Sequence, residues 1–248
     1  MLKEARLNQI LEAVNERKYM SLRALMDLTN SSESTIRADL IELSDAGKIY
    51  RLRGGAQAIN NESFSFELSL EDKLGIRLAE KKAIARKALT LIRPNTIVYF
   101  DAGTSTYALA EELDVPGVKV VTNSIYLARK VISKGYKAYV IGGEFKSSTD
   151  AFIGPMAQEI LSRFHFDIGF FGTNGIHLEQ GCTTPDVEEA AIKQKAMNQC
   201  EEAYILADSS KFGVVTSVSF HSFDPEHIIT DHIEKDEFKN LGILEAKA

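Results

Sequence analysis

The sequence is poor in cysteine and has no long apolar run. Its 248 residues include two cysteines, Cys182 and Cys200, which lie far apart and show no pairing pattern. We therefore expect reduced thiols and no disulfide. No stretch approaches the roughly 20 apolar residues that a membrane-spanning helix needs. The first residues carry acids throughout and do not form a cleavable signal. These absences predict a cytoplasmic protein with no membrane partner.

Histidine is also scarce, and its spacing fits no metal site. The five histidines show none of the close spacings that zinc ligands form. The sequence also lacks a Walker phosphate-binding loop and the glycine fingerprint of dinucleotide-binding proteins. We therefore expect neither a metal nor a cofactor.

Positive charge is in short supply overall, but its distribution is uneven. The net charge is −6, which by itself argues against a nucleic-acid partner. Residues 1–59 hold 9 Lys and Arg against 8 Asp and Glu, a net charge of +1, and the remainder holds 20 against 27, a net charge of −7. Residues 48–59 contain Lys48, Arg51 and Arg53 and no acid. The local field in this segment is therefore positive, which favours contact with DNA phosphates.

A sharply defined helix precedes this basic segment. Ser32 is placed to cap its first turn, and Glu33 suits the positive end of the helix dipole. Ile36, Leu40 and Leu43 recur at helical spacing and would bury one face. The other face is polar and ends at Arg37, whose long side chain carries a guanidinium group that donates hydrogen bonds. Together with the cap residue, it supplies the predicted DNA contacts of this helix: Ser32, Ser34, Thr35 and Arg37.

The residues after this helix alternate charged and apolar side chains, as a short β-hairpin does. Two amphipathic helices come before the helix that Ser32 caps. One spans Leu2–Arg17, and the other follows the capping residue Ser21. Three helices and a hairpin predict a winged helix-turn-helix whose third helix enters the major groove. Arg51 and Arg53 of the wing would then contact the DNA backbone or the minor groove. The alternative is a three-helix module that binds protein, but such a helix would expose apolar anchors.

The second part of the chain alternates short apolar strands with helices. This alternation predicts an α/β fold with a mostly parallel sheet covered by helices on both faces. We expect a DNA-binding domain over residues 1–58, a linker over residues 59–75 and an effector domain over residues 76–248, with a helical stretch over 71–92 that breaks near residue 75. The expected strands are Thr96–Phe100, Lys119–Thr122, Ala138–Ile141, Asp167–Phe171, Ala203–Leu206 and Ile228–Ile229, and the expected helices are Thr106–Leu113, Ile125–Ser133, Met156–Phe164 and Val187–Gln199.

Most of the expected strands end in glycine and polar residues. In a parallel sheet, ligands bind outside the carboxyl ends of the strands. The segment Asp101–Thr106 follows a strand and opens a helix, so its glycine, hydroxyls and free N–H groups suit an anion such as a sugar phosphate. An ordinary capped helix start is the alternative. The predicted effector residues at these strand ends are Asp101, Gly103, Thr104, Ser105, Thr106, Asn123, Ser124, Gly142, Gly143, Gly172 and Asn174.

Three charged residues complete the predicted effector site. Glu189 and Lys193 stand four residues apart and share a helix face, so they are either effector contacts or a surface ion pair. Lys211 either supplies a cation to the ligand or is solvated. The glycines at 142–143 and 172–175 either bring backbone close to the ligand or form tight turns.

Several motifs along the chain resemble the DeoR-type repressors of sugar catabolism. They are SESTIRADL followed by LRGGA, EKKAIARKA, FDAGTSTYALA, VTNS, GGEF, FDIGFFGTNGI, GCTTPDVEEAAIKQKAM and ILADSSKFG. The resemblance implies a winged helix-turn-helix joined to an effector domain similar to pentose-phosphate isomerases and amino-sugar-phosphate deaminases. It also implies operator binding as a homo-oligomer, either a dimer or a tetramer. The implied effector is a phosphorylated sugar, with fructose 1-phosphate or a similar ketose phosphate as the expected one.

Two positions depart from the family pattern. The family usually has a second Arg after the equivalent of Arg37, and this chain has Ala38, which puts the operator sequence in question and not DNA binding itself. The isomerase-like enzymes carry an acid-rich stretch where this chain has Gly172-Thr-Asn-Gly-Ile. Asn174 cannot exchange a proton at neutral pH, so the enolisation of a sugar loses its base. We therefore expect a repressor that binds the sugar phosphate without converting it. The alternatives are an isomerase-like or deaminase-like enzyme and a ligand-activated activator.

Overall fold

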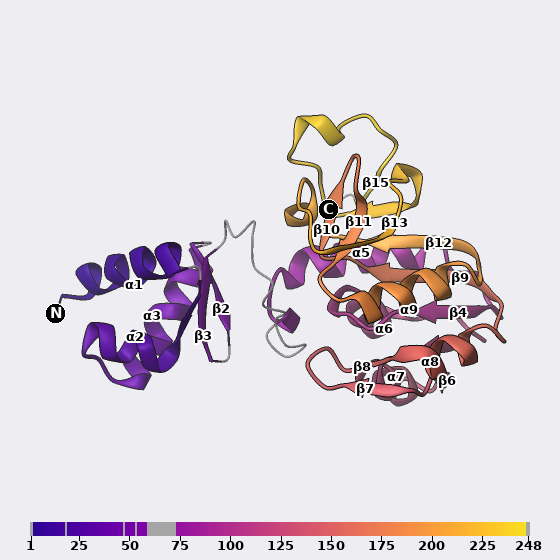
Figure 1. The fold of residues 1–248 in the computed structure, drawn as a ribbon, viewed down its shortest axis with the longest axis horizontal. Coiled ribbons are helices and arrows are strands. Elements are labelled where there is room, and N and C mark those ends of the chain that lie inside the picture. Colours follow the sequence, from indigo (N-terminus) through magenta and orange to yellow (C-terminus); the bar gives the residue numbers. More distant parts are fainter. Residues whose placement is uncertain (1, 18, 47, 53, 59–72, 247–248) are drawn as a thin grey trace. The chain divides into compact units, whose positions relative to one another are not determined.

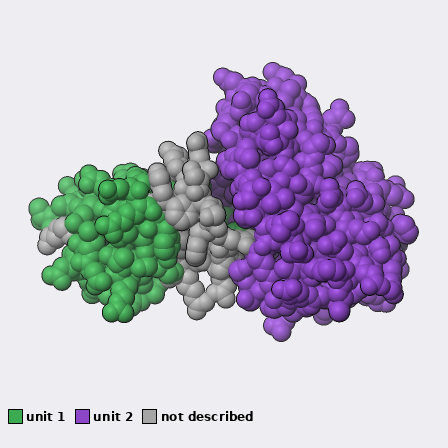
Figure 2. Space-filling model, in the orientation of Figure 1, with its two compact units in different colours: residues 1–64, 71–76 green, residues 65–70, 77–248 purple. Residues whose placement is uncertain are grey.

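The computed structural model describes residues 2–17, 19–46, 48–52, 54–58 and 73–246 (Figure 1). They belong to two compact units, residues 1–64 with 71–76 and residues 65–70 with 77–248 (Figure 2). Most of the linker expected over residues 59–75 lies outside the described residues, so its bounds remain a prediction. Of the helices described, none is both long and apolar enough to cross a membrane.

The first unit is a helix-turn-helix with a three-stranded antiparallel wing. The strand order is β1-β3-β2, and the helices pack on the sheet around buried Ile10, Leu25 and Ile36. The predicted fold is therefore confirmed, but the strand β1 was not expected because three residues are too short to show a pattern. The elements are α1 (Lys3–Arg17), β1 (Tyr19–Ser21), α2 (Leu22–Thr29), α3 (Glu33–Asp45), β2 (Ile49–Leu52) and β3 (Gly55–Ala58).

Two backbone features fix this unit. Asn30 adopts a left-handed conformation (φ 49°) that ends α2, and its N–H donates to the carbonyl of Met26. Gly55 lies so close to β1 that a Cβ atom there would come within 2.0 Å of the carbonyl oxygen of Met20. The third strand can therefore pair only if residue 55 has no side chain.

The second unit is built on a seven-stranded parallel sheet. Its strand order is β15-β14-β12-β9-β4-β5-β6, and every neighbouring pair is parallel. The predicted α/β class is therefore confirmed. The strands are β4 (Ile97–Phe100), β5 (Lys119–Thr122), β6 (Lys137–Val140), β9 (Phe166–Gly172), β12 (Cys200–Leu206), β14 (Ile228–Thr230) and β15 (Leu244–Glu245).

Helices cover both faces of this sheet, as can be followed in Figure 1. Because successive strand residues point to opposite faces, Val98 and Val120 pack in one apolar cluster, and Tyr99 and Val121 pack in the other. The first cluster includes residues of α5 (Leu78–Leu89), α6 (Thr104–Glu112) and α7 (Ile125–Ser133), and the second includes residues of α8 (Gly154–Leu161) and α9 (Val187–Met197).

The sequence did not reveal the smaller β elements of this unit. They have three or four residues each, which is too short for apolar alternation to stand out. The antiparallel hairpin consists of β7 (Glu144–Lys146) and β8 (Ala151–Ile153), and the small sheet consists of β10 (Gly175–His177), β11 (Gly181–Thr184) and β13 (Val218–His221). Three short 3-10 turns, η1 (Ser209–Lys211), η2 (Pro225–His227) and η3 (Asp236–Phe238), lie in the last part of the unit.

The helical stretch expected over 71–92 is interrupted. Lys73 and Leu74 are helical, residues 75–77 form a turn, and α5 begins at Leu78. The residue with a positive φ is Arg77 (φ 50°, ψ 46°), and not the neighbouring Gly75. The break is therefore close to the expected place, but a residue with a side chain makes it.

Candidate functional site

The recognition helix α3 begins as the sequence predicts. The Ser32 hydroxyl accepts a hydrogen bond from the Thr35 N–H at 3.3 Å. The same hydroxyl lies 3.0 Å from the Ser34 hydroxyl and 2.8 Å from the Thr35 hydroxyl. Ser32 and Ser34 are exposed, and Thr35 is half-buried. Ile36 is completely buried on the opposite face. The start of α3 therefore presents a cluster of small hydroxyl groups to solvent.

Arg37 lies on the same exposed face and has a carboxylate partner. Its Nε donates to Glu33 Oε1 at 2.8 Å, and its Nη2 lies 2.7 Å from the same oxygen. The two side chains are 47% and 55% exposed. An exposed ion pair of this kind contributes little stability. Arg37 can therefore exchange Glu33 for a base edge or a phosphate at small cost.

The predicted wing contacts can be placed only in part. Arg51 lies on β2 with an exposed side chain, opposite Ala56 of β3. Arg53 lies outside the described residues. The DNA contacts of both residues therefore remain predictions.

A buried ion pair orients α3, and the sequence interpretation overlooked it. The Asp39 carboxylate is 2% exposed and accepts two hydrogen bonds from the Arg6 guanidinium of α1, one from Nη2 at 3.1 Å. The signal was present, because Asp39 falls on the apolar face defined by Ile36, Leu40 and Leu43. An acid at such a position indicates a buried partner.

In the second unit, Asp101, Gly172 and Lys193 meet at the carboxyl ends of β4 and β9. The Asp101 carboxylate pairs with the Lys193 ammonium and also accepts the Gly172 N–H at 3.2 Å. Lys193 Nζ also donates to the Gly172 carbonyl at 3.1 Å. Burial raises the pKa of Asp101, and the charge of Lys193 partly offsets this effect. Three of the predicted effector residues therefore form one buried cluster.

A surface ion pair between Glu189 and Lys193 is the wrong interpretation. Glu189 instead accepts hydrogen bonds from Lys146 Nζ at 2.9 Å and Thr149 Oγ1 at 2.6 Å. Lys146 also contacts Asp186, the N-cap of α9, at 2.9 Å. Burial acts to raise the pKa of Glu189, but Lys193, Thr149 and Lys146 together hold it below its usual value. The partners on the β7–β8 hairpin are distant in sequence and could not be expected.

The first turn of α6, where an anion site was predicted, has no side-chain cap. Its N-cap is Gly103, which has no side chain to cap the first N–H groups, and Thr104 and Ser105 are partly exposed. Thr106 is different, because its hydroxyl is fully buried and donates to the Asp101 carbonyl at 2.6 Å. Thr106 therefore holds the loop in shape, and the exposed part of this turn is Gly103–Ser105.

Asn123 and Ser124 connect this turn to the neighbouring strands. The Asn123 amide oxygen accepts the Tyr99 hydroxyl at 3.1 Å and the Ala102 N–H at 2.9 Å, and its Nδ2 donates to Phe152. The Ser124 hydroxyl caps α7 and donates to Asp150 Oδ2 at 2.6 Å. Both side chains are buried. They therefore hold the neighbouring loops in place and are not exposed to a ligand.

The predicted glycine loops lie at the same edge of the sheet. Gly143 needs to be glycine, since its φ is 156° and a Cβ atom would come within 2.7 Å of the Ile153 carbonyl. Gly142 and Gly172 are partly exposed. Asn174 is tied to β11, because its N–H donates to the Thr183 carbonyl at 3.0 Å and its amide oxygen accepts the Thr184 hydroxyl at 3.3 Å.

Lys211 belongs to a second charged cluster, after β12. Asp208 in this cluster is 3% exposed. Burial acts to raise its pKa, but Lys211, the Ser210 hydroxyl, Arg77 and Lys81 hold it below its usual value. The sequence interpretation overlooked Arg77 and Lys81. Lys81 is buried on the apolar face of α5 with Ile84, Ala85 and Ala88, and that spacing could have singled it out.

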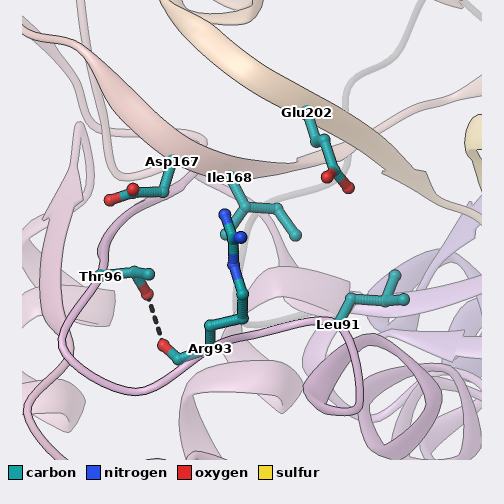
Figure 3. A pocket seen from close by; sticks show the side chains of 6 residues that line it. All are labelled: Leu91, Arg93, Thr96, Asp167, Ile168 and Glu202. Atoms are coloured by element: carbon teal, nitrogen blue, oxygen red, sulfur yellow. Dashed lines mark hydrogen bonds between the residues drawn. The ribbon is translucent and has the colours of Figure 1, made fainter.

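A small pocket lies at the opposite edge of the sheet. Figure 3 shows the Arg93 side chain between Asp167 and Glu202, near the amino ends of β4, β9 and β12. The Asp167 carboxylate accepts the N–H of Ile97, and Thr96 donates to the carbonyl of Arg93. Because the pocket lies away from the carboxyl ends of the strands, it does not join the predicted effector site.

Comparisons with known proteins match both units. The family described as DeoR-like helix-turn-helix domain matches residues 6–62, and the family described as DeoR C terminal sensor domain matches residues 76–232. The chain belongs to the DeoR family. The family resemblance read from the motifs is thus confirmed, and this DeoR-family protein is a DNA-binding transcription regulator of the sugar-operon repressor type.

Its relatives match over nearly their full length. The uncharacterized HTH-type transcriptional regulator FruR of Bacillus subtilis is 37% identical over 97% of this chain and 95% of its own. The lactose phosphotransferase system repressor of Staphylococcus aureus is 33% identical over 89% of this chain and 88% of its own. Among solved structures, the ribose 5-phosphate isomerase of Plasmodium falciparum superposes on 54% of this chain and 52% of its own, with 17% identity and a TM-score of 0.40.

Proposed function

We propose that this DeoR-family repressor controls a sugar-utilisation operon and leaves its operator when a phosphorylated sugar binds at the carboxyl edge of the parallel sheet. The observation that carries the proposal is the start of α6, where Gly103, Thr104 and Ser105 leave the first turn open to an anion. The buried Asp101–Lys193 pair lies beside this turn and fixes the strand end from which the turn starts. Fructose 1-phosphate or a similar ketose phosphate is the proposed effector.

The test is a thermal-shift screen of the full chain against a panel of sugar phosphates that includes fructose 1-phosphate. A ligand that binds only the folded state raises its midpoint of unfolding. Thr104→Asp should abolish the shift, because it places a carboxylate where the phosphate would bind. Thr90→Asp, an exposed change at the far end of α5, is the matched control and should keep the shift. A shift that survives in Thr104→Asp would refute the phosphate site.

DNA binding is tested with the same preparations. We propose a homo-oligomer, because a single helix-turn-helix reads one half-site and a symmetric assembly reads two. A repressor of this kind works where the chromosome is, so we place it in the cytoplasm. Light scattering distinguishes a monomer, dimer and tetramer. Titration of operator DNA with and without the sugar phosphate gives the sign of the response, and tighter binding with ligand would indicate an activator instead.

We propose further that the effector unit does not convert its ligand. The Glu189 carboxylate is engaged by Lys146 and Thr149, and an amide stands at Asn174, so neither is a free base for enolisation. Turnover of ketose and aldose phosphates by the purified protein, followed by a coupled assay, would contradict this.

A further inference from the structure

The chain enters the effector unit through a residue in an unfavourable backbone conformation. Arg77 is the first residue of that unit after Ile76 and directly precedes α5. Its left-handed backbone (φ 50°, ψ 46°) is uncommon for a residue with a long side chain. Lys73 and Leu74 before it are helical, so a right-handed Arg77 would allow the two helical segments to become one. The bend at Arg77 is therefore what makes α5 begin at Leu78.

The Arg77 side chain is held by the loop that follows β12. Its Nη1 donates to the Ser209 hydroxyl at 3.3 Å, and its Nε lies 3.6 Å from Asp208 Oδ1. Asp208 and Ser209 are 3% and 4% exposed, so they form a fixed part of the unit. An unfavourable backbone conformation persists only where the surroundings hold it. The contacts with Asp208 and Ser209, together with Glu80 Oε1 at 3.6 Å from Nη1, contribute to that hold.

The same loop belongs to the edge of the sheet that carries the candidate effector site. β12 pairs with β9 along its length, and β9 ends at Gly172, which contacts Asp101 and Lys193. Lys211 lies in the same short turn as Ser209 and is one of the predicted effector contacts. A ligand that draws this turn toward Asp101 therefore moves the groups that hold Arg77.

We propose that Arg77 is a latch: effector binding frees its side chain from Asp208 and Ser209, its backbone relaxes to the right-handed conformation, and α5 gains residues at its N-terminus. This inference rests on the proposed function, since it provides the route from the effector site to DNA. Each residue that joins an α-helix adds about 1.5 Å of rise and about 100° of rotation. The extension thus changes the point and the direction at which the chain enters α5. Arg77 is a positioning residue.

The first experiment needs neither ligand nor DNA. Hydrogen exchange of the full chain is compared for wild type, Arg77→Ala, Arg77→Gly and the control Arg86→Ala, which alters a 69% exposed arginine on the same helix. Alanine favours the helix, so exchange over residues 74–81 should slow several-fold in Arg77→Ala. Glycine tolerates the left-handed backbone, so Arg77→Gly should show no such slowing. Exchange in Arg77→Ala equal to that in Arg86→Ala would overturn the latch.

The second experiment measures coupling. The probes are fructose 1-phosphate and a duplex selected by the wild-type protein from a random pool. In the wild type the ligand changes DNA affinity by some factor, and in Arg77→Ala this factor should fall to about one while the thermal shift with fructose 1-phosphate remains. An unchanged factor in Arg77→Ala would overturn the proposal. If no sugar phosphate shifts the wild type, the proposed function fails, and the exchange experiment still decides the latch.

Discussion

The two units arrange their functional polar side chains in opposite ways. In the DNA-binding unit, Ser34 and Arg37 are exposed and Thr35 is half-buried, and their contacts stay within the first turns of α3. In the effector unit, Asp101 and Lys193 are buried and join β4 to α9. An exposed pair is exchanged at little cost, whereas breaking a buried pair is costly. The residues proposed to read DNA can therefore change partners easily, whereas the residues proposed to sense a ligand are tied into the fold.

The largest expected effect comes from breaking the buried pair. Lys193→Met leaves the Asp101 carboxylate buried without its cation, which should destabilise the effector unit by about 3–5 kcal/mol. Urea unfolding followed by circular dichroism measures the loss. Lys195→Met, a half-buried lysine on the same helix, should cost much less.

A second variant separates charge from packing. Asp101→Asn combined with Lys193→Met removes both charges and should recover part of the lost stability, because no unpaired charge remains buried. If the single and double variants are equally unstable, the lost stability comes from changed packing and not from an unpaired buried charge. The buried pair of the effector unit would then not differ from the exposed pair in the way described above.

The next effect concerns the exposed pair. Arg37→Ala should weaken operator binding by about 1–3 kcal/mol if Arg37 contacts a base, and it should relax specificity at that position. The midpoint of unfolding should hardly change, because the pair with Glu33 is exposed. Fluorescence anisotropy with operator and mutated duplexes measures the affinities. Full affinity for the operator would remove Arg37 from the reading surface.

The same contrast explains what the sequence could predict. The helices and the hairpin of the DNA-binding unit were predictable, because a cap, a helical repeat and a basic hairpin are local signals. The parallel sheet was predictable from alternation, and so was the edge where Asp101, Gly172 and Lys193 meet. The partners were not predictable. Lys146 reaches Glu189 from 43 positions away, through a hairpin too short to show a pattern.

Charged residues on apolar helix faces indicated buried ion pairs that were not predicted. Asp39 and Lys81 each occupy an apolar helix face, where a charge requires a partner. The spacing alone identifies such positions as important. It does not identify the partner, because Arg6 and Asp208 are brought close only by the packing of whole elements.

The response to acid should differ between two carboxylates of the effector unit. The pKa of Asp208 is lowered in the folded state, so its ionised form stabilises the fold above the unfolded pKa of about 3.9, and this contribution is lost as the pH falls through the folded value. The pKa of Asp101 is raised, so its protonation on acidification favours the folded state. Unfolding free energies measured at a series of acidic pH values should therefore fall less steeply in Asp208→Asn than in wild type, and more steeply in Asp101→Asn. Equal slopes in all three proteins would show that neither carboxylate controls acid stability.

The smallest expected effect is that of the wing. Arg51 is exposed on β2, and a phosphate contact there carries no sequence information. Arg51→Ala should weaken binding by a similar factor for the operator and for unrelated duplexes, and it should lower the slope of log affinity against log salt by about one. Arg37→Ala should instead act mainly on the operator. If Arg51→Ala changed specificity, the wing would contact bases as well, and base recognition could no longer be assigned to α3 alone.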